Sequence, residues 1–213
     1  MLQISDVGLA YGDHSLWQGV EFTVQPGEMT AVIGPSGSGK SSLLNCVGML
    51  VKPDSGAIMF EGADLVRFGG GQQRQFRRAQ LGYLFQNYAL MEDASVTANL
   101  LVATRAARLR RRAAVEAMEE ALAQVGLAGM RSHRVAQLSG GEQQRVAMAR
   151  LLVRSPRLVL ADEPTGALDA DNRAVVMSHL RRLAEAGAVV LVATHDDTVR
   201  HACDTTLDLV GYQ

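Results

Sequence analysis

The sequence predicts an α/β fold in which an antiparallel β subdomain and a helical subdomain accompany a phosphate-binding core. Apolar and polar residues alternate over much of the first 24 positions, as in half-buried strands. Apolar runs alternate with amphipathic helical stretches in the last 60 residues, as in a parallel sheet. An alanine-rich stretch without strand patterns lies between them. We therefore expect one domain, residues 1–213, in which residues 1–86 and 154–213 form the core with the β subdomain and residues 87–153 form the helical subdomain.

Charge and composition limit the possible function classes. The 213 residues carry a formal net charge of −1 and 20% charged side chains, so no global field recruits nucleic acid. No apolar run reaches the roughly 18 residues that cross a bilayer, and the start lacks a secretory signal pattern. We expect a soluble chain that reaches a membrane only through a partner. Cys46 and Cys203 are too few for a disulfide framework and are expected to be buried or idle thiols.

Two N-terminal strands are predicted from the alternation of Leu2 to Tyr11 and of Leu16 to Val24. A turn with the sequence Q-P-G-E follows and closes this antiparallel segment. Tyr11 ends the first strand, and two interpretations of its ring stay open. Either the ring packs in the core or rim, or it lies exposed and stacks on a purine, a contact worth about 1–3 kcal/mol.

The central motif is the phosphate-binding loop G-x-x-x-x-G-K-S, which runs from Gly34 to Ser41. It follows the apolar run 29–33, which suits a buried strand, and precedes residues 43–50, which have helical periodicity. Glycines in the loop let backbone N–H groups turn inward around a polyphosphate, and the following helix aims its positive end at the anion. We expect Lys40 to reach the terminal phosphates and Ser41 to coordinate Mg²⁺.

This motif predicts a P-loop NTPase core, which binds a nucleoside triphosphate with Mg²⁺. Taken alone, it does not separate kinases, GTPases and transport ATPases. The residues expected to contact the triphosphate are Gly34, Pro35, Ser36, Gly37, Ser38, Gly39, Lys40, Ser41 and Ser42.

Between the loop and the helical region, two further strands are predicted at residues 57–61 and 81–85. The three glycines at 69–71 are interpreted as irregular, and the arginine-containing residues 74–78 as a short polar segment. Gln86 directly follows the second of these strands. It therefore lies at the carboxyl edge, where open α/β sheets keep their ligands, and we expect it to reach metal or water there.

One long helical pattern covers the middle of the chain, from Ser95 as N-cap to Val125, with Gly126 as the stop. Five arginines lie in its centre, between residues 105 and 112. A solvated helix face or a helix junction explains them better than a patch that binds anions or a membrane surface.

A second helix start with uncovered amides is predicted at L-S-G-G-E-Q-Q-R, residues 138–145. Ser139 has the chemistry of an N-cap, and Gly140 and Gly141 leave the first amides of the helix uncovered. On these residues alone two interpretations stay open: an ordinary capped helix, and a second site that receives an anion.

Two later strands deliver polar side chains to the same edge of the sheet. Residues 157–161 lead into Asp162 and Glu163, and residues 188–193 lead into the sequence T-H-D, which contains His195. Adjacent residues of an extended strand point to opposite sides, so the two carboxylates are expected to have different tasks. Asp162 suits Mg²⁺ held through water, Glu163 suits proton transfer from an attacking water, and His195 suits donation to a terminal phosphate oxygen.

In this order, the motifs resemble those of the nucleotide-binding subunit of an ABC transporter. They are G-P-S-G-S-G-K-S-S, Gln86 after a strand, L-S-G-G-E-Q-Q-R, L-V-L-A-D-E-P-T-G-A-L-D and A-T-H-D, and together they span nearly the whole chain. The resemblance implies a RecA-like P-loop core and a head-to-tail dimer that sandwiches two ATP molecules. In that dimer, the trans contacts that complete the ATP site of the other chain are Ser139, Gly140, Gly141 and Gln143.

The same resemblance implies roles for individual residues. Tyr11 would stack on adenine, and Gln86 would sense Mg²⁺ and the transmembrane partner. Asp169 would couple the two ATP sites across the dimer, and His195 would contact the γ-phosphate. The implied catalytic residues are Lys40, Gln86, Glu163 and His195, and the implied metal ligands are Ser41, Gln86 and Asp162.

Within that family, F-Q-N-Y-A-L, A-D-E-P-T-G-A-L-D and the lack of a C-terminal regulatory domain resemble the macrolide-exporter and lipoprotein-release group, including ATPases assigned to bacteriocin or peptide export. The resemblance implies an ATPase that powers export or extraction through a separate membrane permease. Such a subunit is peripheral, lies at the cytoplasmic face of a bacterial inner membrane and has no nucleic-acid partner. Two departures from the group's pattern, at residues 69–71 and 134–136, bear on the partner-facing surface.

Two other interpretations stay open. One is a regulatory ATPase that transmits force to a membrane complex without moving a solute, as in the cell-division relatives of this group. The other is an ABC-type ATPase of DNA repair or chromosome maintenance, but such proteins insert long coiled-coil arms between the glutamine and the signature, the motif that reads L-S-G-G-E-Q-Q-R here. Here only 52 residues separate Gln86 from Ser139, without sustained heptads.

Overall fold

The computed structural model describes residues 1–12, 14–166 and 168–213. Asp13 lies outside the described residues, and so does Ala167 of the A-D-E-P-T-G-A-L-D motif. An antiparallel sheet has the strand order β2-β1-β4-β5, and a parallel sheet has the order β6-β7-β8-β3-β9. The strands are β1 (Leu2–Tyr11), β2 (His14–Val24), β3 (Met29–Ile33), β4 (Ser55–Phe60), β5 (Ala63–Asp64), β6 (Leu81–Leu84), β7 (Leu158–Asp162), β8 (Val189–Ala193) and β9 (Thr205–Asp208). The α-helices are α1 (Lys40–Val47), α2 (Gly70–Ala79), α3 (Val96–Ala106), α4 (Arg111–Gln124), α5 (Gly140–Leu152), α6 (Ala170–Glu185) and α7 (Asp197–His201).

The parallel sheet is buried on both faces because its central strands are apolar at almost every position. In β7, Leu158 and Leu160 belong to the core cluster that includes α1 and the antiparallel strands. Val159 and Ala161 belong to the cluster that includes α5 and α6. This alternation follows from the two-residue repeat of a strand, and each buried leucine or valine contributes about 1.5–3 kcal/mol. The sheet is therefore a firm support for the residues at its carboxyl edge.

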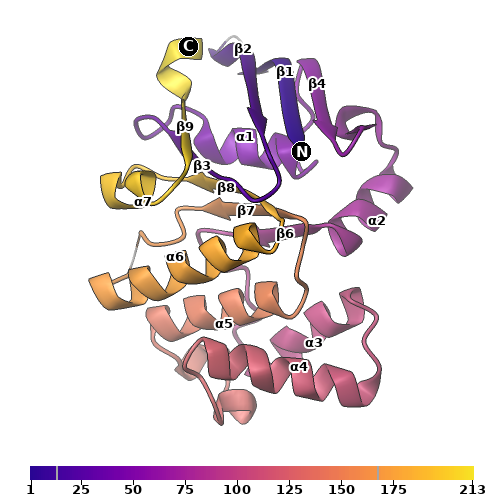
Figure 1. Cartoon of the computed structure of the whole chain (residues 1–213), viewed down its shortest axis with the longest axis vertical. Coiled ribbons are helices and arrows are strands. Elements are labelled where there is room, and N and C mark those ends of the chain that lie inside the picture. The colour runs from indigo at the N-terminus through magenta and orange to yellow at the C-terminus, as the bar shows by residue number, and fades with distance from the viewer. Residues whose placement is uncertain (13, 167) are drawn as a thin grey trace.

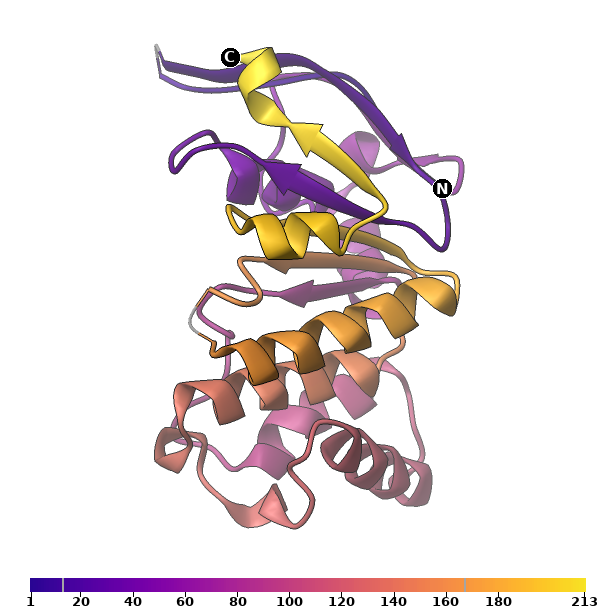
Figure 2. The same ribbon diagram turned by 60° about the vertical axis from the view of Figure 1, so that its left-hand side comes forward.

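The helical part lies at the end of the molecule opposite the antiparallel sheet. Figures 1 and 2 show α3, α4 and α5 together at that end, with the parallel sheet between them and the antiparallel strands. The predicted α/β fold with an antiparallel subdomain is confirmed, whereas the boundaries of the helical subdomain at 87–153 stay a prediction. Within the described ranges, no helix combines the length and the apolar character that a membrane span needs.

The glycine run at residues 69–71 begins a helix, so its interpretation as irregular is wrong. Gly69 is the extended N-cap of α2, and its N–H donates to the Gln72 side chain at 3.0 Å. Phe76 anchors the helix, because its buried ring lies edge-on to Phe60 with 5.6 Å between the centroids. Glycine disfavours a helix by about 1 kcal/mol per residue, and the cap and the buried aromatic pair outweigh that cost here.

The helical pattern from Ser95 to Val125 forms two helices instead of one. Ser95 caps α3 as predicted, because its Oγ accepts from the Ala98 N–H at 3.1 Å. The helical conformation ends at Ala106, before Arg108, whose φ of 56° is left-handed. The next helix, α4, begins at Arg111. Like charges four residues apart disfavour a continuous helix, so the arginine cluster marks a helix junction, one of the two favoured interpretations.

The last strand, β9, had no clear signal in the sequence. It pairs in parallel with β3, although only Leu207 of its four residues is buried. Asp204, just before it, accepts a hydrogen bond from the Met29 N–H at 2.8 Å and pairs with Arg181 at 2.7 Å. Tertiary pairing therefore fixes this strand, because its own residue pattern is too polar to indicate it.

Candidate active site

The phosphate-binding loop leaves β3 and turns into α1 through three glycines with positive φ. These angles are 149° at Gly34, 83° at Gly37 and 71° at Gly39, where an L side chain would be strained. Gly39 is the N-cap of α1, and no side-chain hydrogen bond caps this helix. The first amides of α1 are thus suited to an external anion, as the motif predicts.

Trp17 of β2 packs against this loop, a contact that no sequence pattern indicated. Its indole Nε1–H donates to the Gly39 carbonyl at 3.1 Å, and its side chain is fully buried. A Cβ added at Gly39 would lie 2.7 Å from that indole nitrogen and 2.9 Å from Leu16 Cδ1. Glycine is therefore needed here for close packing as well as for the backbone angle.

Gly34 and Ser38 pack closely against each other inside the loop. A Cβ added at Gly34 would lie 2.5 Å from Ser38 Oγ. The Ser38 hydroxyl is buried and has no hydrogen-bond partner among the described residues. A buried polar group left unsatisfied costs roughly 1–3 kcal/mol, so this hydroxyl favours a ligand oxygen as its partner.

The Lys40 side chain folds back over its own loop. Its ammonium donates to the Gly34 carbonyl at 3.1 Å and to the Pro35 carbonyl at 3.4 Å. Glu163 Oε1 lies 3.9 Å from the same nitrogen, and the two side chains are only 9% and 12% exposed. A cation and a carboxylate therefore lie together beside the phosphate-binding loop.

Asp162 ends β7 beside the start of α1. Burial raises the pKa of Asp162, while a hydrogen bond with the Ser41 side chain lowers it. The Asp162 Oδ1 atom has no hydrogen-bond partner among the described residues. Hydroxyl and carboxylate oxygens are the hard ligands that Mg²⁺ prefers, so this pair fits that ion.

Glu163 follows Asp162 but does not continue the strand. Its φ of 46° is left-handed, so the expectation that both carboxylates project from an extended strand is wrong for Glu163. Such a conformation costs a non-glycine residue roughly 1–3 kcal/mol and is typical of functional sites. The bend places Glu163 Oε1 2.7 Å from Nδ1 of His195, whose ring is 70% exposed just after β8.

A cavity of about 850 Å³ collects most of these residues at the carboxyl edge of the parallel sheet. Tyr11 lines it and is 55% exposed, which favours the interpretation of its ring as a stacking surface. Three residues of the phosphate-binding loop are not in the cavity lining, as far as the described residues define it: Gly34, Pro35 and Ser38. The other predicted residues in the lining are Ser36, Gly37, Gly39, Lys40, Ser41, Ser42, Gln86, Glu163 and His195.

Comparison with known proteins decides the family. The sequence profile of the family described as "ABC transporter" matches residues 17–166, which include the loop, the signature and both carboxylates. The chain belongs to the ABC transporter family. The resemblance that its motifs carry is thereby confirmed.

Several ABC transporter ATP-binding proteins are similar to this chain. An uncharacterized one from Mycobacterium tuberculosis (strain ATCC 25618 / H37Rv) is 38% identical, over 100% of this chain and 66% of its own length. The lipoprotein-releasing system ATP-binding protein LolD of Geobacter metallireducens is 37% identical, over 99% of this chain and 96% of LolD. The macrolide export ATP-binding/permease protein MacB of Vibrio parahaemolyticus is 37% identical, over 98% of this chain and 33% of MacB. The chain thus spans just under two thirds of the mycobacterial relative and almost all of LolD.

Solved ABC cassettes have the same fold. A dimeric bacterial ABC transporter cassette superposes with a TM-score of 0.89 at 32% identity, over 98% of this chain and 95% of that one. A post-hydrolysis state of an ATP-binding cassette, also dimeric and bound to ADP and Pi, gives a TM-score of 0.90 at 31% identity, over 98% and 94% of the two chains. The antiparallel subdomain and the parallel P-loop sheet are therefore the ABC cassette fold.

The ABC signature begins helix α5 with a cap of its own. The Ser139 Oγ accepts from the Glu142 N–H at 3.3 Å, and the Glu142 carboxylate accepts from the Ser139 N–H and hydroxyl, each at 2.8 Å. These bonds lower the pKa of Glu142. Ser139 and Gly140 are exposed. In the described part of the chain, the cavity lining includes neither of them, nor Gly141, nor Gln143.

Asp169 is the N-cap of α6, which packs against α5. Its carboxylate accepts from the Asn172 N–H at 2.8 Å, and Arg145 of α5 donates to the Asn172 carboxamide oxygen. Asn172 thus connects the start of α6 with α5. The role of Asp169 between the two ATP sites of a dimer stays a prediction.

Four residues of the cavity lining were not predicted from the sequence as part of the site: Leu16, Tyr88, Gln144 and Gly166. Tyr88 lies two positions after Gln86 and has a left-handed φ of 61°. Gln144 is buried in α5. Tyr88 lies within F-Q-N-Y-A-L and Gln144 within L-S-G-G-E-Q-Q-R, so their place in these motifs was the signal that could have found them.

Proposed function

We propose that this chain is the ATP-binding and ATP-hydrolysing subunit of an ABC transporter and powers export or extraction of a substrate through a separate membrane permease. One observation carries the proposal. Lys40 Nζ and His195 Nδ1 lie 3.9 Å and 2.7 Å from the same oxygen of Glu163, at the cavity that the phosphate-binding loop lines. A cation, a carboxylate and an imidazole around such a loop suit the hydrolysis of a phosphoanhydride.

Each of these side chains has a distinct part in the proposed reaction. Lys40 binds the terminal phosphates as negative charge builds up on them. Glu163 accepts a proton from water as the water oxygen bonds to the γ-phosphorus. The bond between that phosphorus and the β,γ-bridging oxygen breaks, leaving ADP and phosphate. A positioned general base contributes about 10² to 10⁴ in rate, and His195 orients Glu163 through its Nδ1 and contacts the γ-phosphate.

The proposed ligands are ATP and Mg²⁺. When bound, Mg²⁺ would neutralise charge on the β- and γ-phosphate oxygens. Ser41 and Asp162 would hold it, and Gln86 would approach it from the segment after β6. The unpartnered Asp162 oxygen supports this assignment. The exposed ring of Tyr11 supports adenine stacking at the same cavity.

The active form that we propose is a head-to-tail dimer with two ATP molecules at its interface. The start of α5 supports this arrangement because it is exposed and lies outside the cavity of its own chain. The solved cassettes described as dimeric support it as well. The residues that would face the ATP of the other chain are Ser139, Gly140, Gly141, Gln143 and Asp169.

The proposed partner is an integral membrane permease, which would place the chain at the cytoplasmic face of a bacterial inner membrane. The relatives' names support this, because LolD is the ATP-binding protein of a lipoprotein-releasing system and MacB is an ATP-binding/permease protein. The balanced charge of −1 supports our proposal that nucleic acid is not a partner. We also propose residues 87–153 as the helical subdomain. Bacteriocin or peptide export stays a prediction.

Replacement of Glu163 tests the proposed reaction. We expect Glu163→Gln to lower phosphate release from Mg-ATP by about 10² to 10⁴, while the Kd for Mg-ATP changes little, because the amide cannot accept the proton. Glu120→Gln makes the same isosteric change on the exposed surface of α4 and should leave turnover unaltered. Turnover of Glu163→Gln equal to the parent chain, or no Mg-ATP binding by either chain, would contradict the proposal.

A further inference from the structure

Residues 85–89 separate two hollows of the molecule. Gln86 and Tyr88 line the nucleotide cavity, whereas Phe85 and Ala89 line a second hollow of about 330 Å³ between β6, α3 and α5. Tyr88 and Ala89 have left-handed φ angles of 61° and 46°. Two successive residues of this kind cost roughly 1–3 kcal/mol each, so surrounding contacts must hold them.

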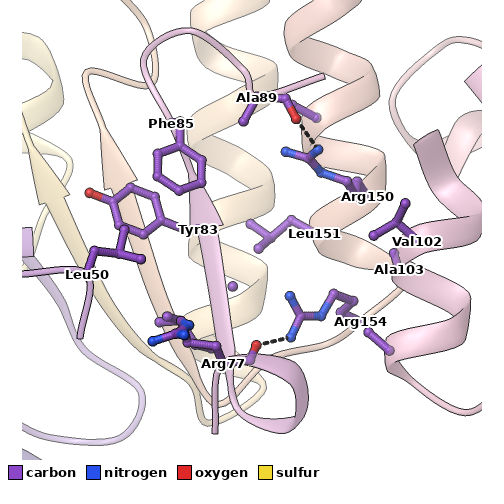
Figure 3. Close-up of a pocket in the computed structure, with 14 residues that line it drawn as sticks. Leu50, Arg77, Tyr83, Phe85, Ala89, Val102, Ala103, Arg150, Leu151 and Arg154 are labelled. Carbon is purple, nitrogen blue, oxygen red and sulfur yellow. Dashed lines mark hydrogen bonds between the residues drawn. The ribbon is translucent and has the colours of Figure 1, made fainter. Parts of the chain in front are cut away.

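Arg150 of α5 supplies such contacts. Its Nη2 donates to the Tyr88 carbonyl at 2.8 Å, and its Nη1 donates to the Ala89 carbonyl at 2.6 Å. Figure 3 shows the Arg150 guanidinium beside Ala89, with the hydrogen bond to its carbonyl oxygen as a dashed line. In the described part of the chain, Arg150 has no carboxylate partner within salt-bridge distance. The fixed fork of the guanidinium is therefore used on two successive backbone carbonyls.

We propose that Arg150 is a positioning residue for ATP hydrolysis. It fixes the backbone of Tyr88 and Ala89, and it thereby holds Gln86 where that side chain lines the nucleotide cavity. This inference rests on the proposed function for its catalytic consequence, but the mechanical claim about the 85–89 segment does not. A purely structural arginine would stabilise the fold without acting through Gln86.

Arg154 offers a matched control on the same helix. It lies four residues after Arg150, and its Nη2 donates to the carbonyls of Arg77 and Arg78 at 2.6 Å and 2.7 Å. Those carbonyls belong to the last turn of α2, which leaves its final carbonyls without helical partners. Figure 3 shows both arginines at the same hollow with different targets. Arg154 therefore shares the burial and bonding of Arg150 without touching the segment that carries Gln86.

Hydrogen exchange of the nucleotide-free chain tests the mechanical claim. We expect Arg150→Lys to accelerate exchange of the Tyr88 and Ala89 amides about 10-fold, because an ammonium lacks the fork that bonds both carbonyls. Arg154→Lys should leave these amides unchanged. Equal acceleration in the two variants, or none in Arg150→Lys, would overturn the inference. This readout requires neither ATP nor hydrolysis.

A double-mutant cycle tests the route through Gln86. We expect Arg150→Lys to lower kcat about 10-fold with little change in KM, and Arg154→Lys to lower it less than about 2-fold. In a Gln86→Ala background, Arg150→Lys should cause no further loss. Losses that multiply would show that Arg150 acts independently of Gln86 and would overturn the inference. If the parent chain hydrolyses no ATP, the proposed function fails, and the exchange result still decides the claim about Arg150.

Discussion

The two glycine-flanked helix starts of this ABC cassette differ in what satisfies their first amides. Helix α1 begins after Gly39 without a side-chain cap and lines a cavity of its own chain, with Trp17 bonded to the Gly39 carbonyl. Helix α5 begins after the exposed Ser139, which forms a reciprocal cap with Glu142. An uncapped start that lines a cavity of its own chain is suited to binding an anion within one chain. A capped and exposed start is stable on its own and is suited to a ligand that arrives with a second chain.

The largest effect should follow from removing the charge at the start of α1. We expect Lys40→Met to weaken Mg-ATP binding about 10- to 100-fold, because it deletes the charged hydrogen-bond donor that reaches the phosphates. Lys52→Met removes a lysine from an exposed position and should leave the Kd unchanged. Isothermal titration calorimetry gives both values. Unaltered binding by Lys40→Met would show that the α1 start is not the anion site.

The next effect separates a cap from a site. Ser139→Ala and Ser95→Ala each remove an N-cap hydroxyl, and each should cost about 1 kcal/mol in the free energy of unfolding. Only Ser139→Ala should also lower ATP turnover, by about 10-fold, because only that hydroxyl would meet the γ-phosphate of another chain. Urea unfolding and steady-state hydrolysis measure the two quantities. Equal turnover in both variants would show that Ser139 acts only as an N-cap and has no part in ATP hydrolysis.

The smallest effect is electrostatic and concerns Glu142. Hydrogen bonds from Ser139 lower the pKa of Glu142 from its ordinary value of 4.5, so its charge adds stability above that value. This contribution is lost as the pH falls through the lower pKa of the folded state. We expect the parent chain to have a slightly higher Tm than Glu142→Gln at neutral pH, and the difference to shrink as the pH falls through the folded-state pKa of Glu142. A difference that grows on acidification would contradict this assignment.

Most of the candidate nucleotide site could be proposed from the sequence because its motifs are local. The loop from Gly34 to Ser41 has a fixed spacing, and its context between an apolar strand and a helix was visible in the residues. Asp162 and His195 follow apolar runs, so the geometry of a parallel sheet gathers them at one edge. These inferences needed only periodicity and the rule that parallel strands end at the same side.

The remaining features depend on contacts distant in sequence. Trp17 packs on the loop from a strand whose alternation says nothing about Gly39. The bend at Glu163 depends on the site around it, and a strand pattern cannot show where the extended backbone ends. The glycines of α2 were misinterpreted because capping and the Phe76 contact outweigh their propensity. In each case tertiary packing decides a conformation that local preference leaves open.

The molar mass of the hydrolysis-impaired chain in solution tests the contrast between the two helix starts most directly. Light scattering after size exclusion would compare Glu163→Gln with and without Mg-ATP, and the double variant Glu163→Gln with Ser139→Arg under the same conditions. We expect a dimer only for Glu163→Gln with Mg-ATP, and a monomer that still binds ATP for the double variant. A Glu163→Gln chain that stays monomeric with Mg-ATP bound, or a double variant that dimerises equally well, would contradict the account.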